Sequence, residues 1–103
     1  MNKKERTLLL KTEFDCVKGD DVYFKVDKNV YRGIVVDLVP KHEHPSKYFT
    51  EEVPDSRDKS YMWEDDNGSL TSVLFRVMTG KKNNLVTYYS SREITRKVEK
   101  VKV

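Results

Sequence analysis

Residues 18–39, KGDDVYFKVDKNVYRGIVVDLV, decide the fold class of this chain. Val22, Phe24 and Val26 alternate with polar side chains, a period of two that is typical of a strand buried on one face. A tight turn of polar residues follows. The second strand then contains residues 34–36, Ile-Val-Val, which are all apolar and β-branched and so indicate burial on both faces. The stretch predicts an antiparallel hairpin at the centre of a sheet.

Two features of the second strand predict curvature and an external cover. Gly33 lies within the strand, where a glycine often marks a bulge or a sharp bend, and strong curvature is what a small barrel needs. Because residues 34–36 are apolar on both faces, another part of the chain must cover the outer one. We expect residues 8–10 together with Tyr48 and Phe49 to form this cover.

Further strands are predicted downstream. A short strand at 60–64 is expected to turn back at Asn67-Gly68 into a long strand at 69–79, because Asn-Gly between apolar runs is a strong hairpin signal. Residues 85–90, LVTYYS, form the next strand. One face of the long strand is expected to carry Val73, Phe75 and Val77, and the other Ser72, Leu74, Arg76 and Met78.

The N-terminal segment fits two structures. Residues 7–14 match either an edge strand or a short helix, and the apolar run at 8–10 agrees with both. The alternation of Thr12, Phe14 and Cys16 favours the strand.

The C-terminal segment also leaves two alternatives open. Ser90 and Glu93 match a capping box, which favours one helical turn over 91–94 and a closing strand at about 96–102. Ile94, Val98 and Val101 have helical spacing, so a full C-terminal helix is the alternative.

This order of elements resembles the SH3-like small β-barrels of the Tudor or KOW type. The residues that carry the resemblance are KGDDVYF (18–24), VYRGIVV (30–36) and SSREI (90–94). The chain is also similar to small uncharacterised barrel proteins of Gram-positive bacteria and their phages. The resemblance implies a mostly β fold and a binding module for protein, peptide or nucleic acid rather than an enzyme. The fold expected is an SH3-like small barrel of about five strands with one helical turn before the last strand.

Length and composition predict one domain over residues 1–103. It divides into an N-terminal segment at 1–17, a barrel made of 18–39 and 70–103, and a long excursion at 40–69. Hydrophobic residues make up 37% and charged residues 36%, and no apolar run is long enough for a membrane span or a signal-peptide core. With its single cysteine, the chain is expected to be cytoplasmic, with no membrane partner.

Candidate catalytic and metal-binding residues are few. His42 and His44, with Glu43 or Cys16, offer metal-ligand chemistry, but the spacing matches no established zinc pattern. Cys16 has no activating neighbour in the sequence. We therefore expect no enzyme activity, no metal and no cofactor.

Tyr23, Tyr31 and Trp63 supply rings for an aromatic cage, although ordinary core or surface roles are the more common outcome for such residues.

The charge distribution suggests two binding hypotheses. Net charge is +3, but residues 40–69 are acidic and residues 70–103 are basic. In the first hypothesis, the acidic segment contacts an unknown protein partner through carboxylates and aromatic anchors. Its residues are Tyr48, Phe49, Trp63, Asp65 and Asp66.

In the alternative hypothesis, the basic third of the chain binds nucleic acid. Its cations would neutralise phosphates while an aromatic ring stacks on bases. The residues are Arg76, Lys81, Lys82, Tyr88, Arg92, Arg96 and Lys97. Protein binding is placed slightly ahead, because the net charge is small for a sequence-independent nucleic-acid binder.

Overall fold

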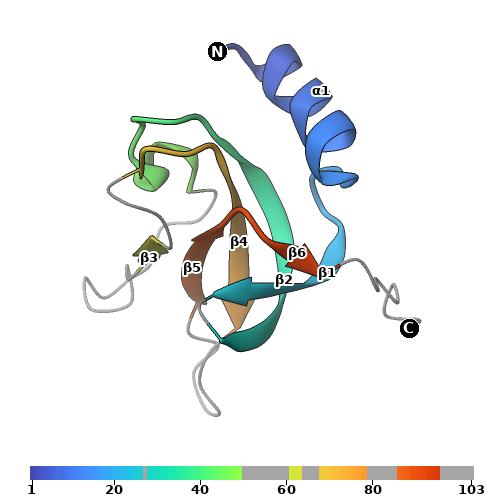
Figure 1. Cartoon of the computed structure of the whole chain (residues 1–103), viewed down its shortest axis with the longest axis vertical. Coiled ribbons are helices and arrows are strands. Elements are labelled where there is room, and N and C mark those ends of the chain that lie inside the picture. The colour runs from blue at the N-terminus through green and yellow to red at the C-terminus, as the bar shows by residue number, and fades with distance from the viewer. Residues whose placement is uncertain (27, 50–60, 64–67, 79–85, 96–103) are drawn as a thin grey trace.

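The computed structural model describes residues 1–26, 28–49, 61–63, 68–78 and 86–95, and it is mostly β (Figure 1). One helix and one short 3-10 turn accompany the strands. The elements are α1 (Lys3–Phe14), β1 (Asp21–Val26), β2 (Asn29–Val39), η1 (Pro45–Tyr48), β3 (Tyr61–Trp63), β4 (Ser72–Met78), β5 (Val86–Ser91) and β6 (Ile94–Thr95).

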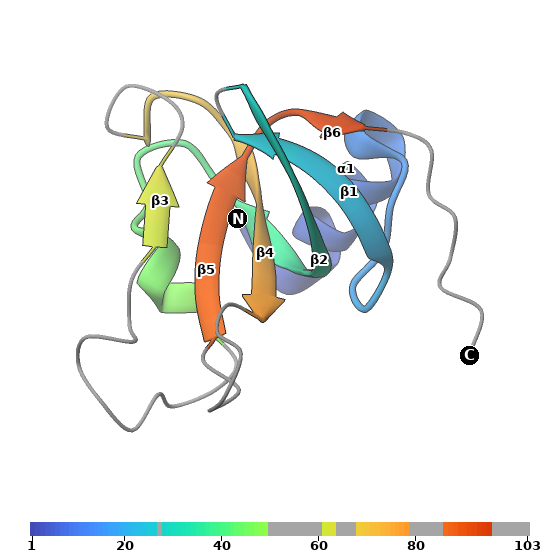
Figure 2. The same cartoon turned by 90° about the horizontal axis from the view of Figure 1, so that it is seen from below.

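The strands form one sheet in the order β3-β5-β4-β2-β1-β6. Its centre is the four antiparallel strands β5, β4, β2 and β1, and the short strands β3 and β6 are its edges. The sheet curls strongly, so that β1 runs across the direction of β4 and β5 (Figures 1 and 2). Within the described residues the sheet is open, and the closed barrel of about five strands expected from the sequence is not seen.

The predicted hairpin between 60–64 and 69–79 is wrong in its pairing. A strand does occupy Tyr61–Trp63, but it pairs with β5 in parallel and not with β4. A parallel pair needs no tight turn between its strands. The Asn-Gly sequence therefore did not predict the strand that pairs with β3.

The inner face of the sheet carries the larger core cluster. Val22, Phe24 and Val26 of β1 are buried there, as the period of two predicts. Val73, Phe75 and Val77 of β4 join them, which confirms the predicted faces of that strand. The rings of Phe24 and Phe75 stack with centroids 3.9 Å apart. This contact joins β1 to β4 across β2.

Glycine is required where β2 crosses this core. A Cβ at Gly33 would lie 2.9 Å from the Arg76 carbonyl oxygen and 3.1 Å from Cε1 of Phe24, so any other residue would require the backbone of β4 to shift. The bulge itself comes three residues later, where the register shifts between Val35 and Asp37. The in-strand glycine thus marks a close approach, and the bulge is at Val36.

The outer face of the sheet carries a second cluster. Val35 lies in the inner cluster, whereas Val36 lies in the outer one with Val39, Leu74, Val86 and Tyr88, so β2 is buried on both faces as predicted. Tyr48 and Phe49 pack on this outer cluster, and the Phe49 ring stacks on Tyr88 at 4.0 Å. The expected cover by these two aromatic residues is confirmed. The expected contribution of residues 8–10 is wrong, because Leu9 and Leu10 pack with the inner cluster and Leu8 is exposed.

The N-terminal segment is helix α1, which corrects the preference for an edge strand. Asn2 is the N-cap: its side chain accepts the Glu5 N–H at 2.8 Å, and the Glu5 carboxylate accepts the Asn2 N–H. This reciprocal capping box satisfies two donors at the helix start. Leu10 is fully buried in the inner cluster, with Leu9 and Phe14 packed beside it.

The helical turn expected over 91–94 is also wrong. Ser91 still belongs to β5, a bend follows, and Ile94–Thr95 pair with β1 as β6. Ser90 is not a helix cap, because its buried hydroxyl hydrogen-bonds Ser72 across the sheet. The closing strand expected at about 96–102 lies outside the described residues.

Candidate binding surfaces

Two of the side chains considered for catalysis or metal binding, those of Cys16 and His44, have structural roles. Cys16 is 4% exposed, and burial, aided by the charges of Asp20 and Asp15, raises the pKa of its thiol to about 11. It is therefore protonated at neutral pH and is a poor nucleophile. The Nδ1 atom of His44 accepts the Ser46 N–H at 3.2 Å and caps η1. Among the described residues, no group of three His, Cys, Asp or Glu side chains converges on a metal-sized site.

The two tyrosines suggested for an aromatic cage do not come together. Tyr31 is opposite Phe24 on the inner face of the hairpin and stacks on Tyr89 at 4.7 Å. Tyr23 is opposite Arg32 on the other face. A cage that contains both tyrosines is thus excluded by the alternation of β1. Trp63 belongs to β3, and its side chain lies outside the described part of the structure.

Tyr48 and Phe49, proposed as aromatic anchors for a protein partner, are half-buried and hold the segment after β2 against the sheet. The Tyr48 hydroxyl donates to the Glu43 carboxylate at 2.6 Å, and the Arg6 guanidinium lies 5.0 Å from the ring centroid. Burial and the hydrogen bond to Glu43 raise the pKa of Tyr48 to about 12. Asp65 and Asp66 lie outside the described residues. The hypothesis of an acidic protein-binding segment therefore stays a prediction.

The basic C-terminal surface is described only in part. Arg76 is half-buried on β4, and Arg92 is exposed in the bend between β5 and β6. Tyr88 is fully buried beneath Phe49, so its ring is not exposed for stacking on bases. The other four residues of this hypothesis lie outside the described residues, namely Lys81, Lys82, Arg96 and Lys97.

The structure displays a different surface, on the outward side of the β1–β2 hairpin. We call it the hairpin face, and it consists of Tyr23, Lys25, Val30 and Arg32. In the strand register Tyr23 is directly opposite Arg32, and Lys25 is opposite Val30. Tyr23 is 38% exposed and Val30 is 56% exposed. Cross-strand neighbours of this kind lie within side-chain reach of one another, so the four form one continuous surface.

Arg32 is held in place on the hairpin face. Its Nε donates to Oδ1 of Asp21 at 3.0 Å and its Nη2 to Oδ2 at 2.8 Å, which is a bidentate pair. Such a fork fixes the guanidinium plane. Among the described ion pairs none involves Lys25, so the face is weakly basic around an apolar and aromatic centre.

The sequence carried a signal for this surface. Once Val22, Phe24 and Val26 are assigned to the core, Tyr23 and Lys25 must point outward. Val30 and Arg32 were missed because their positions depend on the register of the hairpin, which a sequence pattern does not give. The four side chains offer a partner one aromatic ring, one aliphatic group and two cations.

Comparisons of the chain with protein-family models, with curated protein sequences and with solved structures found no match. Within the described part of the chain, no helix has the length and apolarity needed to cross a membrane.

Proposed function

We propose that this chain is a non-catalytic protein-binding module that contacts its partner through the hairpin face. The observation that carries the proposal is the exposure of Tyr23 and Val30 beside an arginine that Asp21 already orients. Tyrosine and arginine are the residue types that most often dominate the energy of protein interfaces. Because Arg32 is fixed before binding, it loses less conformational entropy when a partner docks.

We also propose that the fold is of the SH3-like type. The pairing of β6 with β1 supports this, since it brings the last described strand back beside the first. A sheet must return in this way before it can close into a small barrel. Barrels of that type mostly bind proteins, peptides or nucleic acid, so the proposed fold agrees with a binding role.

The test is an affinity pull-down from a lysate of the source organism, with and without nuclease. Tyr23→Ala and Arg32→Ala are each expected to weaken partner capture about tenfold or more, because each removes a central contact. Lys47→Ala is the matched control, since Lys47 is exposed on η1 and is not part of the hairpin face. Far-UV circular dichroism checks that the variants are folded.

Three outcomes would decide the proposal. Capture that is lost with both hairpin variants, kept by Lys47→Ala and unaffected by nuclease supports it. Capture that both hairpin variants retain in full would show that the contact surface lies elsewhere. If nuclease removes all captured protein, the interaction runs through nucleic acid and the protein-binding proposal is wrong.

A further inference from the structure

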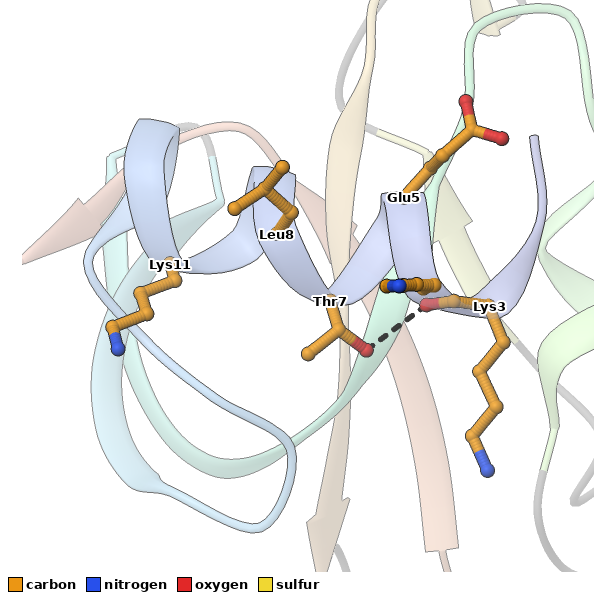
Figure 3. Close-up of a pocket in the computed structure, with 6 residues that line it drawn as sticks. Lys3, Glu5, Thr7, Leu8 and Lys11 are labelled. Atoms are coloured by element: carbon orange, nitrogen blue, oxygen red, sulfur yellow. Dashed lines mark hydrogen bonds between the residues drawn. The ribbon is translucent and has the colours of Figure 1, made fainter.

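A second exposed surface lies on helix α1, on the side that faces away from the sheet. We call it the outer helix face; Figure 3 shows its side chains. Leu8 is 61% exposed at its centre, although the next two residues, Leu9 and Leu10, pack towards the inner cluster. The face is a shallow depression of about 740 Å³, and its described lining residues are Lys3, Lys4, Glu5, Thr7, Leu8 and Lys11.

The outer helix face is positively charged. None of the described ion pairs involves Lys3, Lys4 or Lys11. The one carboxylate in the lining, Glu5, belongs to the capping box and points away from Lys3 and Lys11 (Figure 3). The Thr7 hydroxyl donates to the Lys3 carbonyl at 2.9 Å, so its hydrogen is already used. Three ammonium groups therefore set the electrostatic character of the face.

The shape of this surface suits a large partner. Its described lining residues all come from one helix, so within the described part of the chain no second element faces them as an opposite wall. Small-molecule sites usually bury most of the ligand surface, which a single helix face does not do. The helix lies at one end of the molecule, and no described segment covers its outer side (Figure 1).

We propose that the outer helix face binds the phosphate backbone of duplex DNA. Lys3 and Lys11 are separated by about 12 Å along the helix axis at ~1.5 Å per residue, so the three lysines can reach more than one phosphate. A helix is about 10–12 Å wide, which matches the major groove of about 12 Å. Exposed Leu8 then lies at the centre of the contact, where an apolar side chain can meet a thymine methyl group.

The three lysines favour DNA over an acidic protein or a lipid surface as the partner of this face. Exposed ion pairs with isolated carboxylates of a protein contribute little, because water and salt screen them. DNA carries a condensed layer of counterions, and each lysine that neutralises a phosphate releases some of them. Binding to a lipid surface requires several apolar side chains, whereas Leu8 is the one apolar residue in the described lining of this face. Of these three partners, DNA is thus the one for which three exposed lysines contribute most to the free energy of binding.

The experiment is fluorescence anisotropy with a labelled duplex of about 20 base pairs, titrated at several salt concentrations between about 20 and 200 mM. The slope of log K against log salt measures the number of phosphates neutralised. Each of Lys3→Gln, Lys4→Gln and Lys11→Gln is expected to reduce the slope by about 0.9, and the triple variant by about 2.7. Using differences between variants removes any contribution from basic residues elsewhere in the chain.

Control variants show whether a change in the slope comes from the lost lysine charge or from a change in structure. Lys11→Arg is expected to keep the wild-type slope because it keeps the charge. Lys47→Gln, on η1, is also expected to keep it. Tyr23→Ala should leave DNA binding unchanged, so failure here and failure of the protein-binding proposal are distinguishable.

The outcomes that would overturn the proposal are specific. They include no DNA binding by the wild type at the lowest salt, or a triple glutamine variant with the wild-type slope. A preference for vesicles that contain phosphatidylserine, or for polyglutamate, over DNA would assign the face to a lipid or to an acidic protein. A loss of slope confined to the three lysine positions supports the proposal.

Discussion

At the scale of single residues, the buried thiol of Cys16 makes stability depend on alkaline pH. The folded state holds its pKa at about 11, above the ordinary value of 9.0, chiefly because burial disfavours the thiolate. The unfolded chain therefore releases this proton at lower pH than the folded chain does. The corresponding stabilisation is complete below about pH 9 and is lost as the pH rises towards about 11.

This predicts a fall in the free energy of unfolding between about pH 9 and 11, measured by urea denaturation. The Cys16→Ala variant should show a smaller fall over the same interval. Tyr48 and Tyr89, whose pKa values are also raised, contribute in the same direction in both proteins. Parallel pH profiles for the two proteins would show that the thiol does not titrate as the fold implies.

At the scale of elements, one ionic cluster joins α1, β2 and η1. Asp37 of β2 is 5% exposed, and its carboxylate accepts the Arg6 Nε at 3.2 Å, the Lys18 Nζ at 3.0 Å and the Leu38 N–H at 2.7 Å. Arg6 extends the cluster to the ring of Tyr48. A carboxylate this deeply buried is stable only while its partners remain. The cluster therefore fixes the helix and the segment after β2 on the sheet.

We predict that Arg6→Met lowers the free energy of unfolding by about 2–3 kcal/mol, because it leaves Asp37 with Lys18 as its only cation. The loss should appear first as faster amide exchange in α1 and η1, before the central strands open. Lys47→Met is the control: its pair with Glu43 is 3.8 Å long and exposed, and its loss should change stability by less than about 1 kcal/mol. Equal effects of the two substitutions would contradict a buried clamp.

The elements that could be predicted from the sequence are those in which burial alternates regularly. The hairpin, the faces of β4 and the double burial at Val35 and Val36 were all predictable from apolar spacing alone. Helix α1 was the less favoured of two alternatives because Leu8, Leu9 and Leu10 are consecutive and suit either structure. The informative signal was the cap: Asn followed by Glu three residues later, at Asn2 and Glu5.

The same capping pattern was misleading at Ser90 and Glu93. There the serine is buried in β5, and tertiary pairing overrides the local preference. The binding surfaces were less predictable than the strands for a related reason. Whether an aromatic side chain such as Tyr88 is exposed depends on the segment that packs on it, and Phe49 is distant in sequence. Tyr23 could be assigned outward only because its neighbours alternate.

At the scale of the whole molecule, two apolar clusters share a single sheet. β2 and β4 contribute to both, with Val35 and Phe75 in the inner cluster and Val36 and Leu74 in the outer one. Neither cluster can come apart without disturbing strands that the other one needs. A shared sheet of this kind favours one cooperative unfolding transition for the whole domain.

Neighbouring substitutions on β4 test this cooperativity. Leu74→Ala, in the outer cluster, should lower the free energy of unfolding by about 2–5 kcal/mol, and Val73→Ala, in the inner one, by about 2 kcal/mol. In both variants, near-ultraviolet and far-ultraviolet circular dichroism should report the same midpoint in urea. Met78→Ala on the same strand is the control, because Met78 is 53% exposed and should change stability by about 0.5 kcal/mol or less. An earlier near-ultraviolet transition in Leu74→Ala alone would mean that the outer cluster unfolds separately while the inner cluster still holds the sheet.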